Sequence, residues 1–355
     1  MQNWNRLLVE KASNQGFVER QNTSACSQMN SIAKLESCKG LLNISPLLRA
    51  DIAVVSALTF PAFRSHLADC LLNIGDTAPQ FVAMVARMGK TPVGLLLVQL
   101  PVRAEFSQDS SSVPKTANML SISVLAGWRG QGIAKCLMIA MADTMRDMGC
   151  LAMATAYTTL MLSLQPFERL LASCQWIAPT AKLLISKGYC KEVLKAPWID
   201  AMRAVPADFE VFEWTQLTAP ERSQLEHGVA HGLIPVGLSP FTEVQDIEPA
   251  ISIGMRHKGE VVAWMILTRS PLLVNALCYR SLFVKPHLRT MHGLGPVLLV
   301  QAMQRHAASA LVETRPVGVF GMALNSSTKM VNFFNKRLAP HCFSTYESRE
   351  SYRLL

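Results

Sequence analysis

Apolar and polar residues alternate along Leu120–Val124, and a different period begins a few residues later. Branched and apolar residues at alternate positions are typical of a half-buried strand, whereas the apolar residues from Ile133 onward follow a helical period. Gly127 and Gly130 interrupt the pattern between the two stretches. The sequence therefore predicts a strand that passes through a glycine turn into a helix.

Periodicity predicts further elements on both sides of this turn. Before it, a serine followed by proline at Ser45-Pro46 indicates the start of a helix, and two apolar runs joined at Gly89 indicate a hairpin. After it, we expect a helix over Ile133–Met148 and a strand over Leu151–Thr158.

The order of predicted elements recurs beyond a proline-containing stretch that we interpret as a linker. A capping-box pattern, Thr218 followed by Glu221, opens a helix. A second hairpin follows, and Asn325 is the expected cap of a later helix. We therefore predict a polar N-terminal arm over residues 1–40, a first domain over 41–195, a linker over 196–206 and a second domain over 207–355.

The glycine turn has a chemical use because a helix starts there. The first helical turn leaves backbone N–H groups without intrahelical acceptors, and the helix dipole adds positive potential. Gly130 and Gly132 let the main chain approach a bulky phosphate, and Arg129 offers a charge-assisted contact. These residues predict an anion site that a pyrophosphate group would fit.

The string from Val124 to Ala134 resembles motif A of the GCN5-related N-acetyltransferase (GNAT) superfamily, Gln/Arg-x-x-Gly-x-Gly/Ala, which Arg129, Gly132 and Ala134 match. The resemblance implies that amides of this turn hold the pyrophosphate of acyl-coenzyme A. It also implies that the strand pairs with the pantetheine arm and that a backbone amide polarises the thioester carbonyl. The implied ligand-binding residues are Val124, Leu125, Arg129, Gly130, Gln131, Gly132, Ile133 and Ala134.

The resemblance extends to the second half of the chain. The family's pattern Val-x-Pro-x-x-Arg is similar to Val284-Lys285-Pro286-His287-Leu288-Arg289. The turn that follows is longer than in the first copy, because it begins at Thr290 and reaches Gly293 and Gly295 later, and Pro296 lacks an N–H group. We expect this second copy to bind coenzyme A poorly or not at all. The implied fold class is α+β (mixed α/β), with two tandem GNAT domains, each a central, mostly antiparallel sheet flanked by helices.

Acyl transfer to an amine needs a group that polarises the carbonyl, a neutral amine and, where the pKa requires it, a proton for the thiolate. Leu120–Val124 contains no carboxylate. Ser123 is a candidate for ordering a water molecule, and Tyr157, at the end of the next strand, is the candidate proton donor. The alternatives are an ordinary strand serine and a packed aromatic residue.

The segment after this strand departs from the family pattern, in which a helix carries a tyrosine four residues before a Gly-Phe ending. We expect that helix over Pro179–Lys187 with Gly188-Tyr189 as its ending, which puts Leu184 at the position of the tyrosine. Leu160–Ile177 is then an inserted amphipathic helix that either packs on the domain or covers the acceptor site.

Composition narrows the partners. The net charge of +9 is spread along the chain, so a nucleic-acid partner is not expected. No apolar run approaches the roughly 20 residues of a membrane span, and no secretion signal is evident, which favours a cytoplasmic protein. The nine cysteines form no Cys-x-x-Cys pair, so we expect reduced thiols. His227 and His231 lack an evident third ligand, so we predict no metal site.

These observations predict an acyltransferase that uses acetyl-CoA or another acyl-CoA as co-substrate and modifies an amine of a small molecule by direct transfer in a ternary complex. Two alternatives stay open. In the first alternative, the chain is a transferase whose donor is an acyl carrier protein or an aminoacyl-tRNA. In the second, it is a non-catalytic protein that binds or senses coenzyme A. The acceptor, the acyl length and the oligomeric state are not predicted.

Overall fold

The computed structural model describes residues 42–72, 80–100, 116–241, 246–270, 276–289, 293–309 and 316–355. The predicted polar arm, residues 1–40, lies outside them. The described chain forms two compact units. The N-terminal unit contains residues 42–182 and Glu347–Leu355, and the C-terminal unit contains Leu183–Tyr346. The division into domains 41–195 and 207–355 stays a prediction about the sequence repeat.

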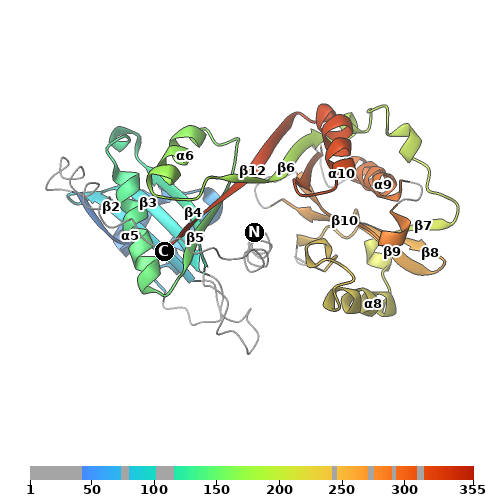
Figure 1. Cartoon of the computed structure of the whole chain (residues 1–355), viewed down its shortest axis with the longest axis horizontal. Helices are drawn as coiled ribbons and strands as arrows, with labels where there is room; N and C mark the ends of the chain where they lie inside the picture. The colour runs from blue at the N-terminus through green and yellow to red at the C-terminus, as the bar shows by residue number, and fades with distance from the viewer. Residues whose placement is uncertain are drawn as a thin grey trace, which may run out of the picture. The chain divides into compact units, whose positions relative to one another are not determined.

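The N-terminal unit has a mostly antiparallel sheet with helices on both faces (Figure 1). Its elements are β1 (Leu42–Pro46), α3 (Ile52–Val55), α4 (Ser65–Asp69), β2 (Gln80–Met88), β3 (Thr91–Leu100), β4 (Thr116–Val124), α5 (Ile133–Asp147), β5 (Ala152–Thr158), α6 (Leu164–Ser173) and most of β12 (Ser344–Leu354). The neighbours β4 and β5 are parallel, and β1–β2, β2–β3, β3–β4 and β5–β12 are antiparallel.

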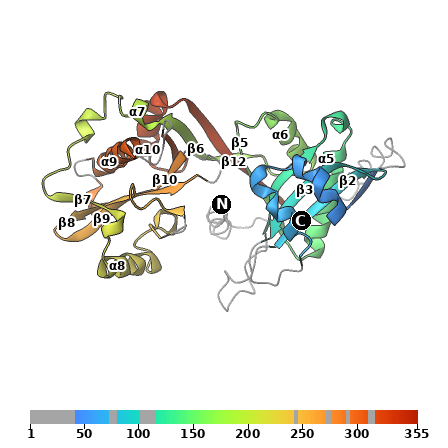
Figure 2. The ribbon, with the colours of Figure 1, turned by 180° about the vertical axis from the view of Figure 1, so that it is seen from behind.

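Alternation along the strands gives this sheet two apolar faces. Leu96 and Val98 of β3 pack in one core cluster with Leu137 and Met141 of α5. The residues between them, such as Leu97, pack on the other face with α3 and α4. Figure 2 shows the short helices of this second face in blue, over β3. Both faces of β3 are therefore buried, as its nearly continuous apolar sequence requires.

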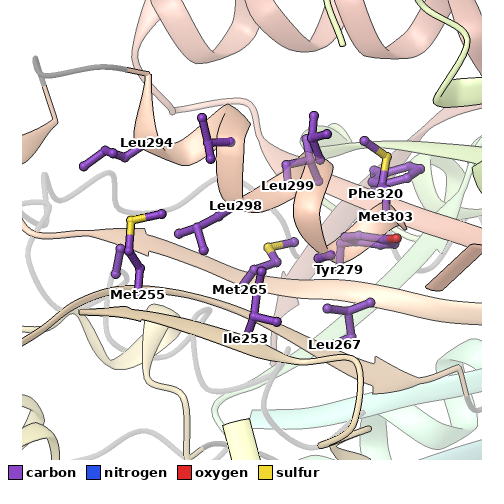
Figure 3. Packing of buried hydrophobic residues seen from close by; sticks show 14 of the residues in the cluster. Ile253, Met255, Met265, Leu267, Tyr279, Leu294, Leu298, Leu299, Met303 and Phe320 are labelled. Carbon is purple, nitrogen blue, oxygen red and sulfur yellow. The ribbon is translucent and has the colours of Figure 1, made fainter. Parts of the chain in front are cut away.

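The C-terminal unit repeats this plan. Its elements are β6 (Thr180–Tyr189), α7 (Cys190–Val193), β7 (Phe209–Glu213), α8 (Ala219–Ala230), β8 (Ile253–His257), β9 (Glu260–Arg269), β10 (Ala276–Val284), α9 (Leu294–Ala308), β11 (Val317–Ala323) and α10 (Thr328–Phe333), which continues as a π-helix over Phe334–Leu338. Figure 3 shows Leu294, Leu298 and Leu299 of α9 packed over Met255 and Met265 of the sheet. The predicted capping box of α8 is confirmed, since Glu221 N–H donates to Thr218 Oγ1 and Thr218 N–H donates to Glu221.

The two sequence halves exchange a strand. β6 follows α6 in the chain but pairs antiparallel with β11, whereas β12, at the other end of the chain, pairs antiparallel with β5. The strands form one mixed sheet of 12 strands in the order β1-β2-β3-β4-β5-β12-β6-β11-β10-β9-β8-β7. The α+β fold class is confirmed, whereas the strand exchange has no counterpart in the predicted order of elements.

Three predicted elements were wrong. Ser45 and Pro46 do not start a helix but end β1, where proline is tolerated because β1 is an edge strand that pairs with β2 alone. Pro179–Lys187 is not a helix, because Thr180–Tyr189 form β6 along β11. The cap of α10 is Ser327, whose Oγ accepts from Met330 N–H, rather than Asn325.

Candidate active site

The predicted glycine turn lies at the end of β4 and is exposed. A short 3-10 helix, Ala126–Trp128, leads into Gly130 and Gly132, which have φ angles of 79° and 80°. This left-handed region favours glycine, because a Cβ would be strained there. A Cβ added at either glycine would meet no atom within 4 Å, so the space in front of the turn is open.

Backbone donors gather at this turn. Gly132 is the N-cap of α5 and no side chain caps the helix. The first amide with a partner in the helix is that of Cys136, which donates to Gly132 O at 3.1 Å. The N–H groups of Ile133, Ala134 and Lys135 precede it and have no intrahelical acceptor. Together with the dipole of a 15-residue helix, they form a site suited to an anion.

Arg129 fixes the turn to the strand. Its Nε donates to Val124 O at 2.9 Å, and its side chain is otherwise exposed. Gln131 Nε2 donates to Gly127 O at 3.4 Å. The other N–H groups of this exposed guanidinium are available to an anion, so one residue both shapes the turn and adds positive charge.

β4 and β5 part beside the turn and form a fork. Their parallel ladder runs from Thr116–Ala152 to Met119–Thr155, where Thr155 Oγ1 donates to Met119 O at 3.3 Å. Beyond this rung, β4 continues to Val124 and β5 to Thr158 without pairing to each other. The backbone groups of β4 that face the fork are thus available to an extended ligand.

The backbone amides of Val124 and Leu125 differ in their hydrogen bonding. Leu125 N–H donates to Val93 O at 2.9 Å and is therefore occupied. Because backbone groups point to alternate sides along an antiparallel strand, those of Val124 face away from β3, toward the fork. The carbonyl of Val124 accepts from Arg129, which leaves the Val124 N–H directed at the fork.

The C-terminal unit has the same fork in a modified form. Arg289 Nε donates to Val284 O at 2.9 Å, Lys285 N–H donates to Val262 O at 2.9 Å, and the β10–β11 ladder ends at Tyr279–Phe320. These contacts match those of Arg129, Leu125 and the Met119–Thr155 rung, so the predicted second copy is visible in the backbone. Thr290 lies outside the described residues.

Two side chains change the second fork. Pro296 supplies no amide to the start of α9, and it lines an apolar cavity of about 210 Å³ with Leu282 and Leu299 among its other walls. Phe283 is buried at the position of Ser123 and stacks on Trp264 with ring centroids 4.4 Å apart. The second fork therefore lacks the open polar character of the first.

Ser123 and Tyr157 lie on opposite faces of the sheet. Ser123 is half-buried on the face where Ser121 and Thr59 share a hydrogen bond of 2.8 Å. Tyr157 packs on the other face, and its hydroxyl donates to Glu168 Oε1 of α6 at 2.8 Å. Burial first, and then this carboxylate, raise the pKa of Tyr157 above its usual range. The structure does not bring the two candidate side chains together.

Sequence reasoning missed the partners of Tyr157. Glu168 also accepts from Arg349 Nη1 at 3.0 Å, and Arg349 donates to Glu347 Oε2 at 2.9 Å. Arg349 belongs to β12, whose place beside β5 has no local signal in the sequence.

The helix after β5 is α6, and the segment that follows it forms β6 in place of the predicted second helix. α6 ends at Ser173 with Cys174 as its C-cap, and it is followed by Gln175, whose φ of 61° is in the left-handed region, and by the buried Trp176. These residues take the place that the sequence analysis gave to Gly188-Tyr189. Four residues before Gln175 stands the buried Leu171, so a leucine has the same spacing from this residue as Leu184 has from Gly188.

His227 and His231 are stacked on each other with ring centroids 3.8 Å apart, and His231 Nδ1 donates to His227 O. Within the described ranges, no group of three or more His, Cys, Asp or Glu side chains is arranged to hold a metal ion. No helix in those ranges is long and apolar enough to cross a membrane.

Residues 53–164, which contain the turn and the fork, match the model of the Acetyltransferase (GNAT) family. The matched residues lie within the N-terminal unit. No curated protein sequence matches the chain.

Solved structures extend the GNAT fold to both units. A tandem GNAT protein from the clavulanic acid biosynthesis pathway superposes with a TM-score of 0.58 at 15% identity, covering 88% of this chain and 98% of its own. A GCN5-related N-acetyltransferase from Sphaerobacter thermophilus gives 0.52 at 13% identity, with 87% and 95% covered. A fungal glucosamine N-acetyltransferase region gives 0.54 at 14% identity, with 88% of this chain and 38% of that chain covered. At these identities the likeness shows a shared tandem fold.

Proposed function

We propose that the protein is an acyl-CoA-dependent N-acyltransferase, with acetyl-CoA or another acyl-CoA as co-substrate and an amine of a small molecule as acceptor. The observation that carries this proposal is the exposed glycine turn at the start of α5, directly beside the β4–β5 fork. A diphosphate needs clustered amide donors, and an extended amide-containing arm needs a free strand edge. In the N-terminal unit, the amide donors at the start of α5 and the free edge of β4 lie next to each other in the chain.

The geometry supports specific roles for the turn and the strand. Arg129, Gly130, Gln131, Gly132, Ile133 and Ala134 would hold the pyrophosphate. Val124 N–H would donate to the thioester carbonyl, because the amide of Leu125 is already bonded to Val93. Leu125 then contributes through the bulk of its side chain, which packs against both core clusters.

The roles of Tyr157 and Ser123 stay hypotheses. As a proton donor to the thiolate, Tyr157 would have to give up the proton that it shares with Glu168, and its raised pKa opposes that step. We therefore favour a positioning role in which Tyr157 anchors α6 to β5. Ser123, on the other face, remains suited to ordering a water molecule at the fork.

Calorimetric titration of the full chain with acetyl-CoA tests the ligand, and thiol release from acetyl-CoA with a panel of primary amines tests the reaction. We expect binding and amine-dependent thiol release. Absence of binding would refute the proposal. Binding without thiol release would favour the sensing alternative. Transfer from acyl-pantetheine carried by a carrier protein, but not from acetyl-CoA, would instead identify a carrier-protein donor.

A further inference from the structure

The C-terminal unit contains a cavity that the proposed acyl transfer does not use. The cavity has a volume of about 210 Å³ and lies between β10, α9 and α10, whose residues Leu282, Leu299 and Phe333 are among its walls. The helices α9 and α10 are neighbours in both ribbon views (Figures 1 and 2). Lys329 is the one charged residue among the described residues that line it, and the others are Leu, Met, Phe, Pro and Gly. The cavity is therefore an apolar space with one cation on its wall.

The apolar walls are fixed by contacts on their other sides. Leu299 is buried and packs in the main core of the unit (Figure 3). The ring of Phe333 meets the ring of Trp198 edge to face, with centroids 5.1 Å apart, and the Trp198 indole N–H donates to Arg337 O at 2.7 Å. Because these side chains are held by neighbours in a closely packed unit, they are not free to move into the cavity and fill it.

The cavity takes the place of a polar helix start in the other unit. Counted from the glycine N-cap of each helix, Gly295 of α9 corresponds to Ala134 of α5. The next residue is Pro296 in α9 and Lys135 in α5. The first exchange removes a methyl group and gives room, and the second removes an N–H donor and a positive charge. The start of α9 is thus less suited to a diphosphate and more suited to an apolar group.

Lys329 adds a second chemical feature at the mouth of the cavity. Lys329 and Met330 line the cavity and are exposed, so it opens to solvent at the first turn of α10. Lys329 forms no ion pair with the residues that the structure describes. Gly295, in the first turn of α9, lines the same space. An anionic group at this mouth would therefore lie near an ammonium group and near the positive end of a helix dipole.

The volume of the cavity sets the size of its ligand. An apolar protein cavity of about 150 Å³ stays dry and binds benzene, which has six carbon atoms. In proportion, a cavity of about 210 Å³ has room for about eight carbon atoms. A buried water molecule needs two or more polar partners, and the leucine and phenylalanine walls supply none. An apolar chain is thus the better occupant.

We propose that the C-terminal unit binds a medium-chain monocarboxylate, with an apolar chain of about eight carbon atoms and a carboxylate at one end. The chain fills the cavity between Leu282, Leu299 and Phe333, and the carboxylate lies at Lys329. Because the ligand contacts β10, α9 and α10 together, it stabilises the folded unit. This inference concerns the second unit and does not rest on acyl transfer in the first.

Calorimetric titration of the full chain with hexanoate, heptanoate, octanoate and decanoate, each below its micelle concentration, tests the size of the site. We expect saturation at one octanoate per chain and an affinity that rises about fourfold for each CH₂ up to octanoate. From octanoate to decanoate the affinity should change less than about twofold, because a longer chain finds no further apolar wall. Absence of octanoate binding, or an affinity that still rises steeply to decanoate, would overturn the inference.

Substitution of Gly295 tests whether the ligand occupies this cavity. A Cβ added at Gly295 would lie 3.7 Å from Leu282 Cδ2, which is ordinary van der Waals contact, so a larger side chain enters the cavity without a backbone clash. Alanine and leucine also favour a helix more than glycine does, so both variants should keep the fold in thermal melts. We expect Gly295→Ala to shift the preferred chain length down by about one carbon and Gly295→Leu to weaken octanoate binding about 100-fold or more. Octanoate binding that Gly295→Leu leaves unchanged would place the ligand elsewhere and refute the site.

Lys329→Met, compared with Lys336→Met, tests the recognition of the carboxylate. Lys336 is exposed on the next helical segment and does not line the cavity, which makes it a matched control. We expect Lys329→Met to weaken octanoate binding about fivefold and to leave octanol binding unchanged, and Lys336→Met to bind both like the wild type. Equal losses in the two variants would show a general charge effect and overturn the assignment of the carboxylate. Competition between octanoate and acetyl-CoA would place octanoate in the first fork and likewise overturn the inference.

Discussion

Gly132 and Gly149 lie at opposite ends of α5 and offer a matched pair of substitutions. Their φ angles are 80° and 76°, and a Cβ at either position would meet no atom within 4 Å. Alanine at each site should therefore cost a similar strain energy, about 1–2 kcal/mol, with no steric clash. For a unit of this size we expect both variants to lower the Tm by about 2–8 °C.

The two variants should differ in ligand binding. A methyl group at Gly132 projects where the phosphate must approach the first-turn amides, whereas Gly149 follows the far end of the helix. Weakening one or two charge-assisted hydrogen bonds costs about 2–3 kcal/mol, so Gly132→Ala should bind acetyl-CoA about 30- to 150-fold more weakly. Gly149→Ala should bind like the wild type.

Isothermal titration at matched temperature and ionic strength, with thermal melts of both variants, measures the two effects separately. Equal loss of affinity in both variants would mean that strain in α5, and not access to the turn, controls binding. Unchanged affinity in Gly132→Ala would refute the assignment of the phosphate to this turn.

Three further results are expected. Burial lowers the pKa of His306 to about 4. The free energy of unfolding should therefore be highest above pH 6.5 and decrease by about 3 kcal/mol as the pH falls toward 4. Urea unfolding of His306→Gln should show a weaker dependence of this free energy on pH. Arg87→Met leaves the buried Asp51 without its bidentate partner and should cost about 3–5 kcal/mol in chemical denaturation, with Asp51→Leu added in the same chain restoring most of it. Tyr157→Phe should change kcat less than about tenfold, because the hydroxyl already donates to Glu168, and a larger decrease would restore Tyr157 as the proton donor.

Local patterns predicted the parts of the site that depend on local structure. The turn from Arg129 to Gly132 was predictable because a positive φ strongly favours glycine, and the capping box at Thr218 because its bonds join residues three apart. The strand β6 was not, because Thr180–Tyr189 owes its conformation to β11, more than a hundred residues later. Residues that meet only through sheet pairing leave no signal in a single sequence.

The same limit hid the residues of β12. Arg349 comes beside Tyr157 only because β12 pairs with β5, and no spacing or periodicity relates residues so far apart. Likewise, the choice between Val124 and Leu125 required knowing that the Leu125 amide reaches Val93 on β3. The glycines and the arginine of the turn indicated the kind of ligand, whereas strand pairing in the sheet determines which backbone amide is free to contact it.

The strand exchange has a consequence for how the protein is made. β5 has no antiparallel neighbour until residues 344–354 have been synthesised, so during translation the unit with the glycine turn has an open sheet edge. Such an edge invites pairing with another nascent chain, and a ribosome that stalls before β12 would release a product that lacks Arg349. Completion of translation is thus a requirement for a paired outer edge of β5, and a dimer formed by mutual insertion of β12 is the misassembly that this topology makes most accessible.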